Sequence, residues 1–158
     1  MKKPKINEQN TQIDNKDNPS ADNPFSNVLK SGEVPKLGVR ATGTVIYEIA
    51  QNSKDQQLYF RIAGQSGGAG LHSKHWIKLS QLLALIESQG DKPWKSQLYK
   101  ELYEKGSANN QGFCAAIVRG LGLATRSGAS IYLHVVSDKY QENKNALLSL
   151  IESTNKAK

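Results

Sequence analysis

The feature that most constrains the fold is a run of alternating, β-branched residues in the first half of the chain. Residues 38–50 read GVRATGTVIYEIA, residues 51–57 form a polar segment, and residues 58–64 read LYFRIAG. Alternation of apolar and polar side chains places each kind on one face of a strand, and a polar segment between two such runs is typical of a turn. We therefore expect an antiparallel β-hairpin over residues 38–64.

Three helices are predicted to follow the hairpin. Ser80 can cap a helix over residues 81–88, and Gly90 is placed to end it. Apolar and aromatic residues at every fourth position predict a second helix over residues 94–105. The third helix is predicted over residues 111–121, because apolar residues recur there with a period of 3.6. The residues of this apolar face are Phe113, Ile117 and Leu121.

The last part of the chain adds one strand and one helix. Residues 130–136, SIYLHVV, alternate as a strand, and residues 146–153, ALLSLIES, form a short amphipathic segment. The sequence thus predicts an α+β fold: an N-terminal antiparallel β-hairpin, three helices in a helix-turn-helix or winged-helix-like arrangement, one strand and a C-terminal helix.

The chain divides by composition into a tail and one domain. Residues 1–36 are mostly polar, so they are expected to form a disordered tail and linker, and residues 37–158 a single α+β domain. Within the linker, Phe25, Val28 and Leu29 leave open a short docking segment instead. The longest aliphatic run is far below the roughly 20 residues that a membrane span requires, so we expect no membrane partner and a cytoplasmic protein.

The charge favours a polyanionic partner. The chain has 21 Lys and Arg against 14 Asp and Glu, a formal net charge of +7, and a pI near 9.5. Because residues 1–36 are nearly neutral, most of this excess belongs to the predicted domain. A basic domain of this kind is typical of proteins that contact nucleic acid, although many basic proteins bind none.

Residues that could carry chemistry do not form a recognisable site. The single cysteine, Cys114, is predicted at the edge of a helix core, and no Cys pair has zinc spacing. The glycines at residues 64–70 match neither a Walker loop nor a dinucleotide fingerprint, and His72 and His75 lack a third metal ligand. We therefore expect no catalytic residues, no metal and no small-molecule cofactor, and a protein that is not an enzyme.

The first hypothesis is a regulatory or accessory DNA-binding protein that contacts duplex through the predicted pair of helices. The outward side of the third helix would carry small residues that let it approach DNA, with amides at its N-terminus that can pair with adenine. The predicted contacts are Asn109, Asn110, Gln111, Arg119 and Arg126, with phosphate contacts from Lys95, Lys100 and Lys105. The same small residues are equally consistent with another element of the protein packing on this side.

Two further hypotheses use aromatic residues. The first is a protein-interaction module, possible also as a homo-oligomer contact, in which aromatic side chains anchor a partner. Its predicted residues are Trp76, Trp94, Tyr99 and Tyr103. The second is a single-stranded nucleic-acid binder in which bases stack on the N-terminal hairpin. Its predicted residues are Tyr47, Tyr59, Phe60 and Arg61.

Overall fold

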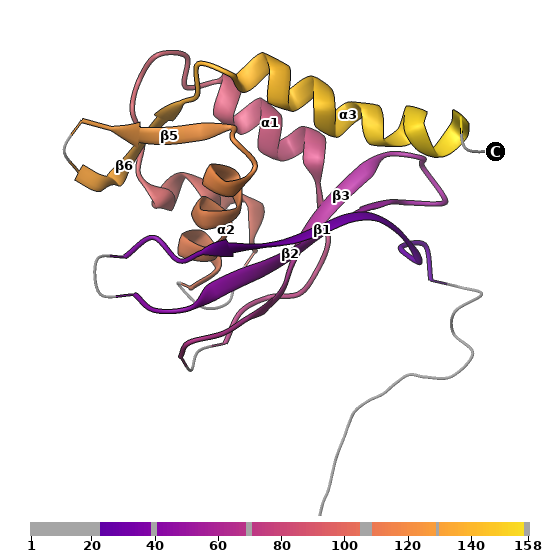
Figure 1. Cartoon of the computed structure of the whole chain (residues 1–158), viewed down its shortest axis with the longest axis horizontal. Helices are drawn as coiled ribbons and strands as arrows, with labels where there is room; N and C mark the ends of the chain where they lie inside the picture. Colours follow the sequence, from indigo (N-terminus) through magenta and orange to yellow (C-terminus); the bar gives the residue numbers. More distant parts are fainter. Residues whose placement is uncertain (1–22, 39–40, 69–70, 105–108, 129, 157–158) are drawn as a thin grey trace, which may run out of the picture.

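The computed structural model describes residues 23–38, 41–68, 71–104, 109–128 and 130–156, which form two antiparallel sheets with helices (Figure 1). The first sheet has the strand order β1-β2-β3-β4, and the second is the hairpin β5-β6. The strands of the first sheet are β1 (Asn27–Pro35), β2 (Thr44–Gln51), β3 (Leu58–Gln65) and β4 (Ile77–Lys78). Those of the second are β5 (Ala124–Ser127) and β6 (Ser130–Val136).

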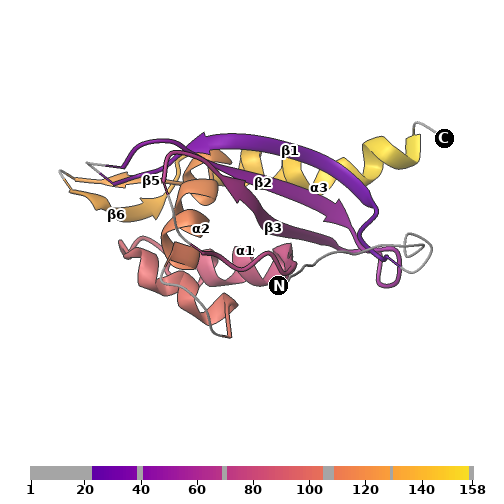
Figure 2. The ribbon, with the colours of Figure 1, turned by 90° about the horizontal axis from the view of Figure 1, so that it is seen from below.

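The helices are α1 (Leu79–Glu87), the 3₁₀ helix η3 (Ser96–Leu102), α2 (Asn109–Gly120) and α3 (Tyr140–Lys156). Helices α1, α2 and α3 contact the first sheet, whereas η3 packs against α1, α2 and β6. Helices α1 and α2 lie on the same side of the sheet (Figure 2), and α2 contacts β1, β2 and β3. Helix α3 is tied to α1, because the Tyr140 hydroxyl donates to Glu87 at 2.5 Å and Lys144 pairs with the same carboxylate at 2.6 Å.

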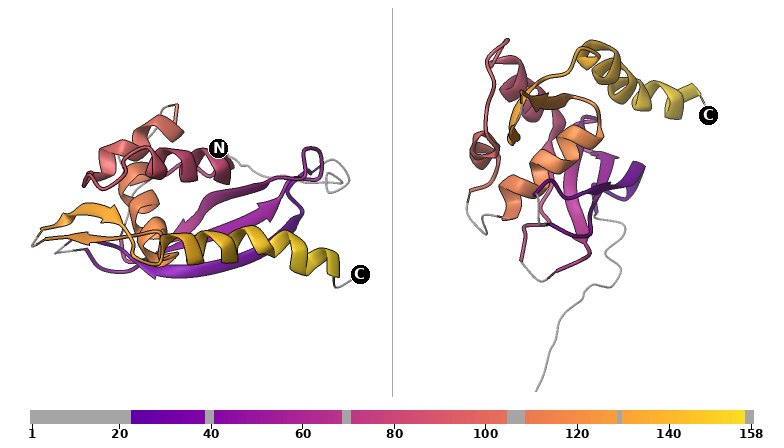
Figure 3. Two further views of the ribbon diagram at one scale, coloured as in Figure 1. Left: turned by 90° about the horizontal axis from the view of Figure 1, so that it is seen from above. Right: turned by 60° about the vertical axis from the view of Figure 1, so that its left-hand side comes forward.

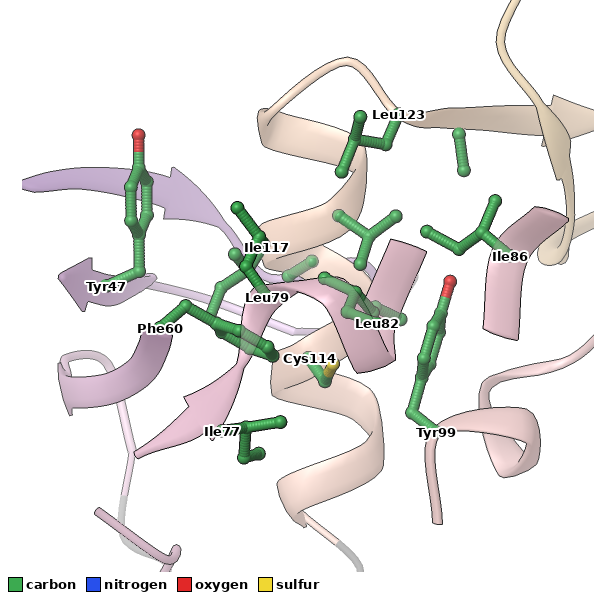
Figure 4. Packing of buried hydrophobic residues seen from close by; sticks show 14 of the residues in the cluster. Tyr47, Phe60, Ile77, Leu79, Leu82, Ile86, Tyr99, Cys114, Ile117 and Leu123 are labelled. Carbon is green, nitrogen blue, oxygen red and sulfur yellow. The ribbon is translucent and has the colours of Figure 1, made fainter. Parts of the chain in front are cut away.

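Alternation along β2 and β3 decides which side chains face the helices. Tyr47 pairs with Ile62 across the two strands, and Ile49 pairs with Phe60; all four are buried. From the other side, Ile117 of α2 and Leu82 of α1 point toward these strands (Figure 4). The core is therefore the layer between the first sheet and the α1–α2 pair.

The predicted fold class is wrong in the order of its elements. Strands β2 and β3 occupy the stretch where an isolated hairpin was expected, but they are the middle of a larger sheet. After α2 the chain forms two paired strands rather than one, since residues 124–127, to which no strand was assigned, form β5. Four residues are too few for a periodic signal, so the pairing with β6 identifies this strand.

The second predicted helix is shorter and starts later than residue 94. The Trp94 backbone is extended and exchanges two hydrogen bonds of 2.8 Å with His134 of β6. A residue bound to a strand in this way cannot begin a helix, so η3 begins at Ser96 and winds as a 3₁₀ helix. A long-range partner therefore overrides the local helical spacing.

The predicted start of the domain at residue 37 also lies too far along the chain. Residues 27–35, assigned to the linker, form β1 and pair with β2 from Asn27↔Gln51 to Pro35↔Thr44. A shift in register between Val28 and Lys30 breaks the alternation of β1, which explains why its sequence does not read as a strand. Residues 1–22 of the predicted tail lie outside the described residues.

Candidate functional site

The outward side of helix α2, on which the DNA hypothesis depends, has two different halves. Toward the C-terminus, the hairpin β5–β6 covers the helix: Ala115 is buried, and Arg119 lies against β6. Toward the N-terminus, Gly112 is exposed and Phe113 is half-buried. Only the N-terminal half of the predicted surface is thus open to a ligand.

The Arg119 side chain forms hydrogen bonds within the protein. Its Nε donates to His134 Nδ1 at 2.9 Å, and its Nη2 donates to the Ile131 carbonyl at 2.9 Å and more weakly to the Leu133 carbonyl at 3.4 Å. These acceptors lie on β6, whose pairing with β5 is irregular between Arg126 and Ser127. Arg119 therefore completes the hydrogen bonding of the hairpin instead of pointing toward solvent.

The electrostatics of this contact follow from burial. Burial lowers the pKa of the Arg119 guanidinium, Tyr99 opposes this shift, and nearby Arg126 adds to it. Burial and the neighbouring guanidinium lower the pKa of His134 to about 4. His134 is hence neutral at pH 7, with Nδ1 as the acceptor and the proton on Nε2.

The three predicted amides lie in different environments. Asn110 is buried: its Oδ1 accepts from the Ser73 backbone at 2.7 Å, and its Nδ2 has no partner among the described residues. Asn109 Nδ2 donates to the Leu71 carbonyl at 3.2 Å, and Gln111 is half-buried. Asn110 is thus a structural residue that fixes the segment before β4, and it is not placed to contact DNA.

The predicted phosphate contacts are at the surface where the structure describes them. Lys95, Lys100 and Arg126 are exposed, whereas Lys105 lies outside the described residues. Arg126 is paired with His134 across β5 and β6, so its side chain leaves the hairpin on the side of Arg119.

A cleft of about 450 Å³ opens over the N-terminal half of α2. One wall is the β1–β2 connection together with the segment after β3, and the other wall is β6. The tips of both hairpins lie at the same end of the molecule (Figure 3, left). The described lining comprises Lys36, Leu37, Gly38, Ala41, Thr42, Gly67, Gly68, Ser96, Asn109, Gly112, Phe113, Ala115, Ile131, Tyr132 and His134.

Two glycines hold the first wall together. Gly43 and Gly67 both have positive φ, 92° and 81°, and a side chain added to either would overlap the backbone of the opposite segment. The Thr42 hydroxyl also donates to the Gly67 carbonyl at 3.0 Å. Because glycine alone allows this approach without strain, the two loops form one fixed wall.

Lys36 supplies the positive charge of that wall. Its Nζ donates to Gln65 Oε1 at 2.6 Å and lies 5.4 Å from the centre of the Phe113 ring. Among the described residues, no carboxylate lies within 4.0 Å of this ammonium group. Its partners are neutral, so its charge remains available to an anion.

The ion pairs between described residues lie away from the cleft. In the part of the chain that the structure describes, the ion pairs are Arg61–Glu48, Lys78–Asp55 and Lys144–Glu87. All three lie on the sheet face away from α2 or between α1 and α3. The described lining of the cleft contains no Asp or Glu. Lys36 is thus the cation of the described lining, and Arg119 and Arg126 both lie beside His134, another residue of that lining.

The aromatic surfaces expected from the sequence are only partly present. Tyr47 and Phe60 are buried, so they cannot stack bases. Tyr59 and Arg61 lie on the opposite face of the sheet, but Tyr59 donates to Asp55 at 2.6 Å and Arg61 pairs with Glu48 at 2.7 Å.

The aromatic residues predicted to form a protein-interaction patch are mostly buried. Trp94, Tyr99 and Tyr103 are core residues, and only Trp76 of that set is half-buried at the surface. The Trp76 ring stacks on Phe25 at 4.7 Å, and Arg61 lies 4.6 Å above it. Phe25 thus provides a contact between the start of the described chain and the outer sheet face.

Nucleophilic and metal chemistry find no support in the described residues. Cys114 is buried, and burial raises the pKa of its thiol to about 12, so the thiolate does not form at neutral pH. His72 and His75 contact different rings, Phe113 and Tyr103. No group of three potential metal ligands exists within the described ranges.

Comparisons with known protein families, curated proteins and solved structures give no match. Within the described residues, no helix has both the length and the apolar composition needed to cross a membrane.

Several residues of the cleft were missed at the level of sequence. Lys36 fell in the expected linker, and no binding role was predicted for Gly67, Gly68 or Tyr132. The glycine-rich stretch was the one available signal, because clustered glycines also occur where two backbones meet closely. Sequence spacing did not indicate which backbone Gly67 would meet.

Proposed function

We propose that this protein binds nucleic acid without catalysing a reaction, and that it does so at the cleft between the β1–β2 and β5–β6 hairpins. The observation that carries the proposal is a cleft whose described lining includes Lys36 and no carboxylate, with Arg119 and Arg126 beside its lining residue His134. Arg61, Lys78 and Lys144, by contrast, are neutralised by acidic partners. Cations that lack such partners favour a ligand that brings regularly spaced negative charge.

This proposal replaces the contact surface of the original hypothesis. Arg119 and Asn110 are bound within the protein, so the outer side of α2 does not act as a free recognition helix. Arg119 still contributes to the local potential, because its charge lies beside the exposed Arg126. Lys36 and Arg126 are thus the side chains expected to meet phosphate.

The test is a titration of fluorescein-labelled 15-nucleotide DNA with the full chain, followed by fluorescence anisotropy at several salt concentrations. Affinity is expected to fall steeply with salt because bound phosphates release counterions. Lys36→Ala should weaken binding several-fold and reduce the log–log salt slope by about 0.7–0.9, the contribution of one phosphate contact.

Lys54→Ala is the matched control. Lys54 is exposed in the β2–β3 turn, which lies at the opposite end of β2 from the β1–β2 connection (Figure 1). The substitution removes the same charge as Lys36→Ala. It should leave affinity nearly unchanged. The proposal is rejected if neither single-stranded nor duplex DNA binds at low salt, or if the two lysine variants weaken binding equally.

A further inference from the structure

We infer that the cleft binds unpaired nucleotides, so that the protein prefers single strands or frayed ends to blunt duplex; this inference depends on the proposed function. Pockets of 300–1,000 Å³ accommodate ligands of about the size of a nucleotide, and the cleft measures about 450 Å³. In a duplex the faces of the bases are covered by stacking and only their edges are accessible. A pocket of this size can therefore receive a base only when the base is unpaired.

Aromatic surface is present on one wall and on the floor of the cleft. Tyr132 of β6 is 57% exposed. Phe113 is half-buried on the floor, beneath Lys36. Bases of any sequence stack on such rings, and each stacked base contributes about 1–3 kcal/mol.

The charge of Lys36 lies beside these aromatic surfaces. Its Nζ is held by Gln65 and by the face of the Phe113 ring, so its position is fixed before a ligand binds. A nucleotide with its base against Tyr132 would place its phosphate within the same cleft, where no described carboxylate opposes it. The cleft thus combines the two elements of single-strand recognition, a stacking surface and a cation.

The wall formed by the β1–β2 connection and the segment after β3 is rich in glycine, which favours an extended ligand such as a polynucleotide. Gly38, Gly67 and Gly68 present backbone without side chains along one side of the cleft. A side chain on Gly68 would begin 3.7 Å from Lys36 Nζ, so glycine keeps the approach to the ammonium group open. A sugar–phosphate backbone can therefore run close to this wall.

The experiment compares four labelled DNA ligands with the full chain at low salt: a 15-nucleotide single strand of dT, one of dA, a blunt 15-base-pair duplex, and the same duplex with a five-nucleotide overhang. Both single strands and the overhang should bind at least about tenfold more tightly than the blunt duplex. A matching RNA strand shows whether the 2′-hydroxyl matters, and binding of either sugar form supports the inference.

Tyr132→Ala should weaken single-strand binding about tenfold, as expected for one lost stacking contact, and should change duplex binding little. Tyr132→Phe keeps the ring and should bind like the original protein. Tyr59→Ala is the matched control, because it removes a tyrosine from the outer face of the sheet. A thermal unfolding curve for each variant confirms that it is folded.

The outcomes separate the two proposals. If no oligonucleotide binds, the proposed function fails, and the inference fails with it. If single strands and blunt duplex bind equally, or if Tyr132→Ala has no effect, nucleic-acid binding stands and the inference is overturned. If Tyr59→Ala weakens single-strand binding and Tyr132→Ala does not, the outer sheet face is the binding surface and the cleft is not.

Discussion

The two halves of helix α2 carry similar small residues on their outward side but meet different surroundings. Around Arg119 the helix lies beneath β6 and supplies that strand with hydrogen bonds. Around Gly112 the same side is the floor of an open cleft. The comparison teaches that small residues along a helix allow close approach without specifying whether the approaching partner is a strand of the same chain or a ligand.

The largest expected effect is at the covered half. Arg119→Met should lower the free energy of unfolding by about 3 kcal/mol, because His134 Nδ1 and two β6 carbonyls lose their donor in a buried site. Urea unfolding followed by circular dichroism measures this loss. Lys100→Met, on the exposed side of η3, should change stability by less than about 0.5 kcal/mol. Equal losses in the two variants would show that β6 does not need Arg119.

The second largest expected effect is a loss of folding stability at acid pH, caused by His134, which contacts the covered half of α2 through Arg119. The folded-state pKa of His134 is lowered to about 4, below the usual 6.5, so the unfolded chain binds a proton first as pH falls. The stability from the neutral imidazole is complete above pH 6.5 and is lost progressively down to about pH 4, on the order of 3 kcal/mol in total. Urea unfolding at several pH values measures the slope.

His134→Asn provides the control for the acid effect. The Asn amide oxygen can take the place of Nδ1 as acceptor from Arg119, but it does not titrate. The pH dependence between 6.5 and 5 should therefore be largely absent in this variant. A slope as steep as that of the original chain would assign the acid sensitivity to other groups.

The smallest expected effects are changes in stability on replacing a glycine of α2 by alanine, and they have opposite signs in the two halves of the helix. Gly112→Ala should stabilise the protein by about 0.5–1 kcal/mol, because alanine is the better helix former and no heavy atom lies within 4 Å of the added Cβ. Gly120→Ala should destabilise it by about 1.5 kcal/mol, because its Cβ would overlap Val34 of β1. Differential scanning calorimetry of both variants tests the difference; changes of the same sign would contradict it.

The sequence alone indicates which side of each central strand is apolar. Alternation over residues 44–51 and 58–65 follows the observed burial, with Ile49 in the core, although the hypothesis of base stacking had used Tyr47 and Phe60, which are buried. The period of 3.6 likewise identified α2 and its buried Ile117. These patterns are local consequences of one face being apolar, so they are readable without knowing the partner.

The tertiary structure decided the rest, because it depends on contacts between distant segments. Pairing with β2 made a strand of residues 27–35, and bonds to His134 kept Trp94 out of a helix. Contact between Gly43 and Gly67 built one wall of the cleft, and β6 closed over Arg119 while leaving Gly112 open. A sequence records that a side chain is small or charged, whereas only the folded chain determines what lies opposite it.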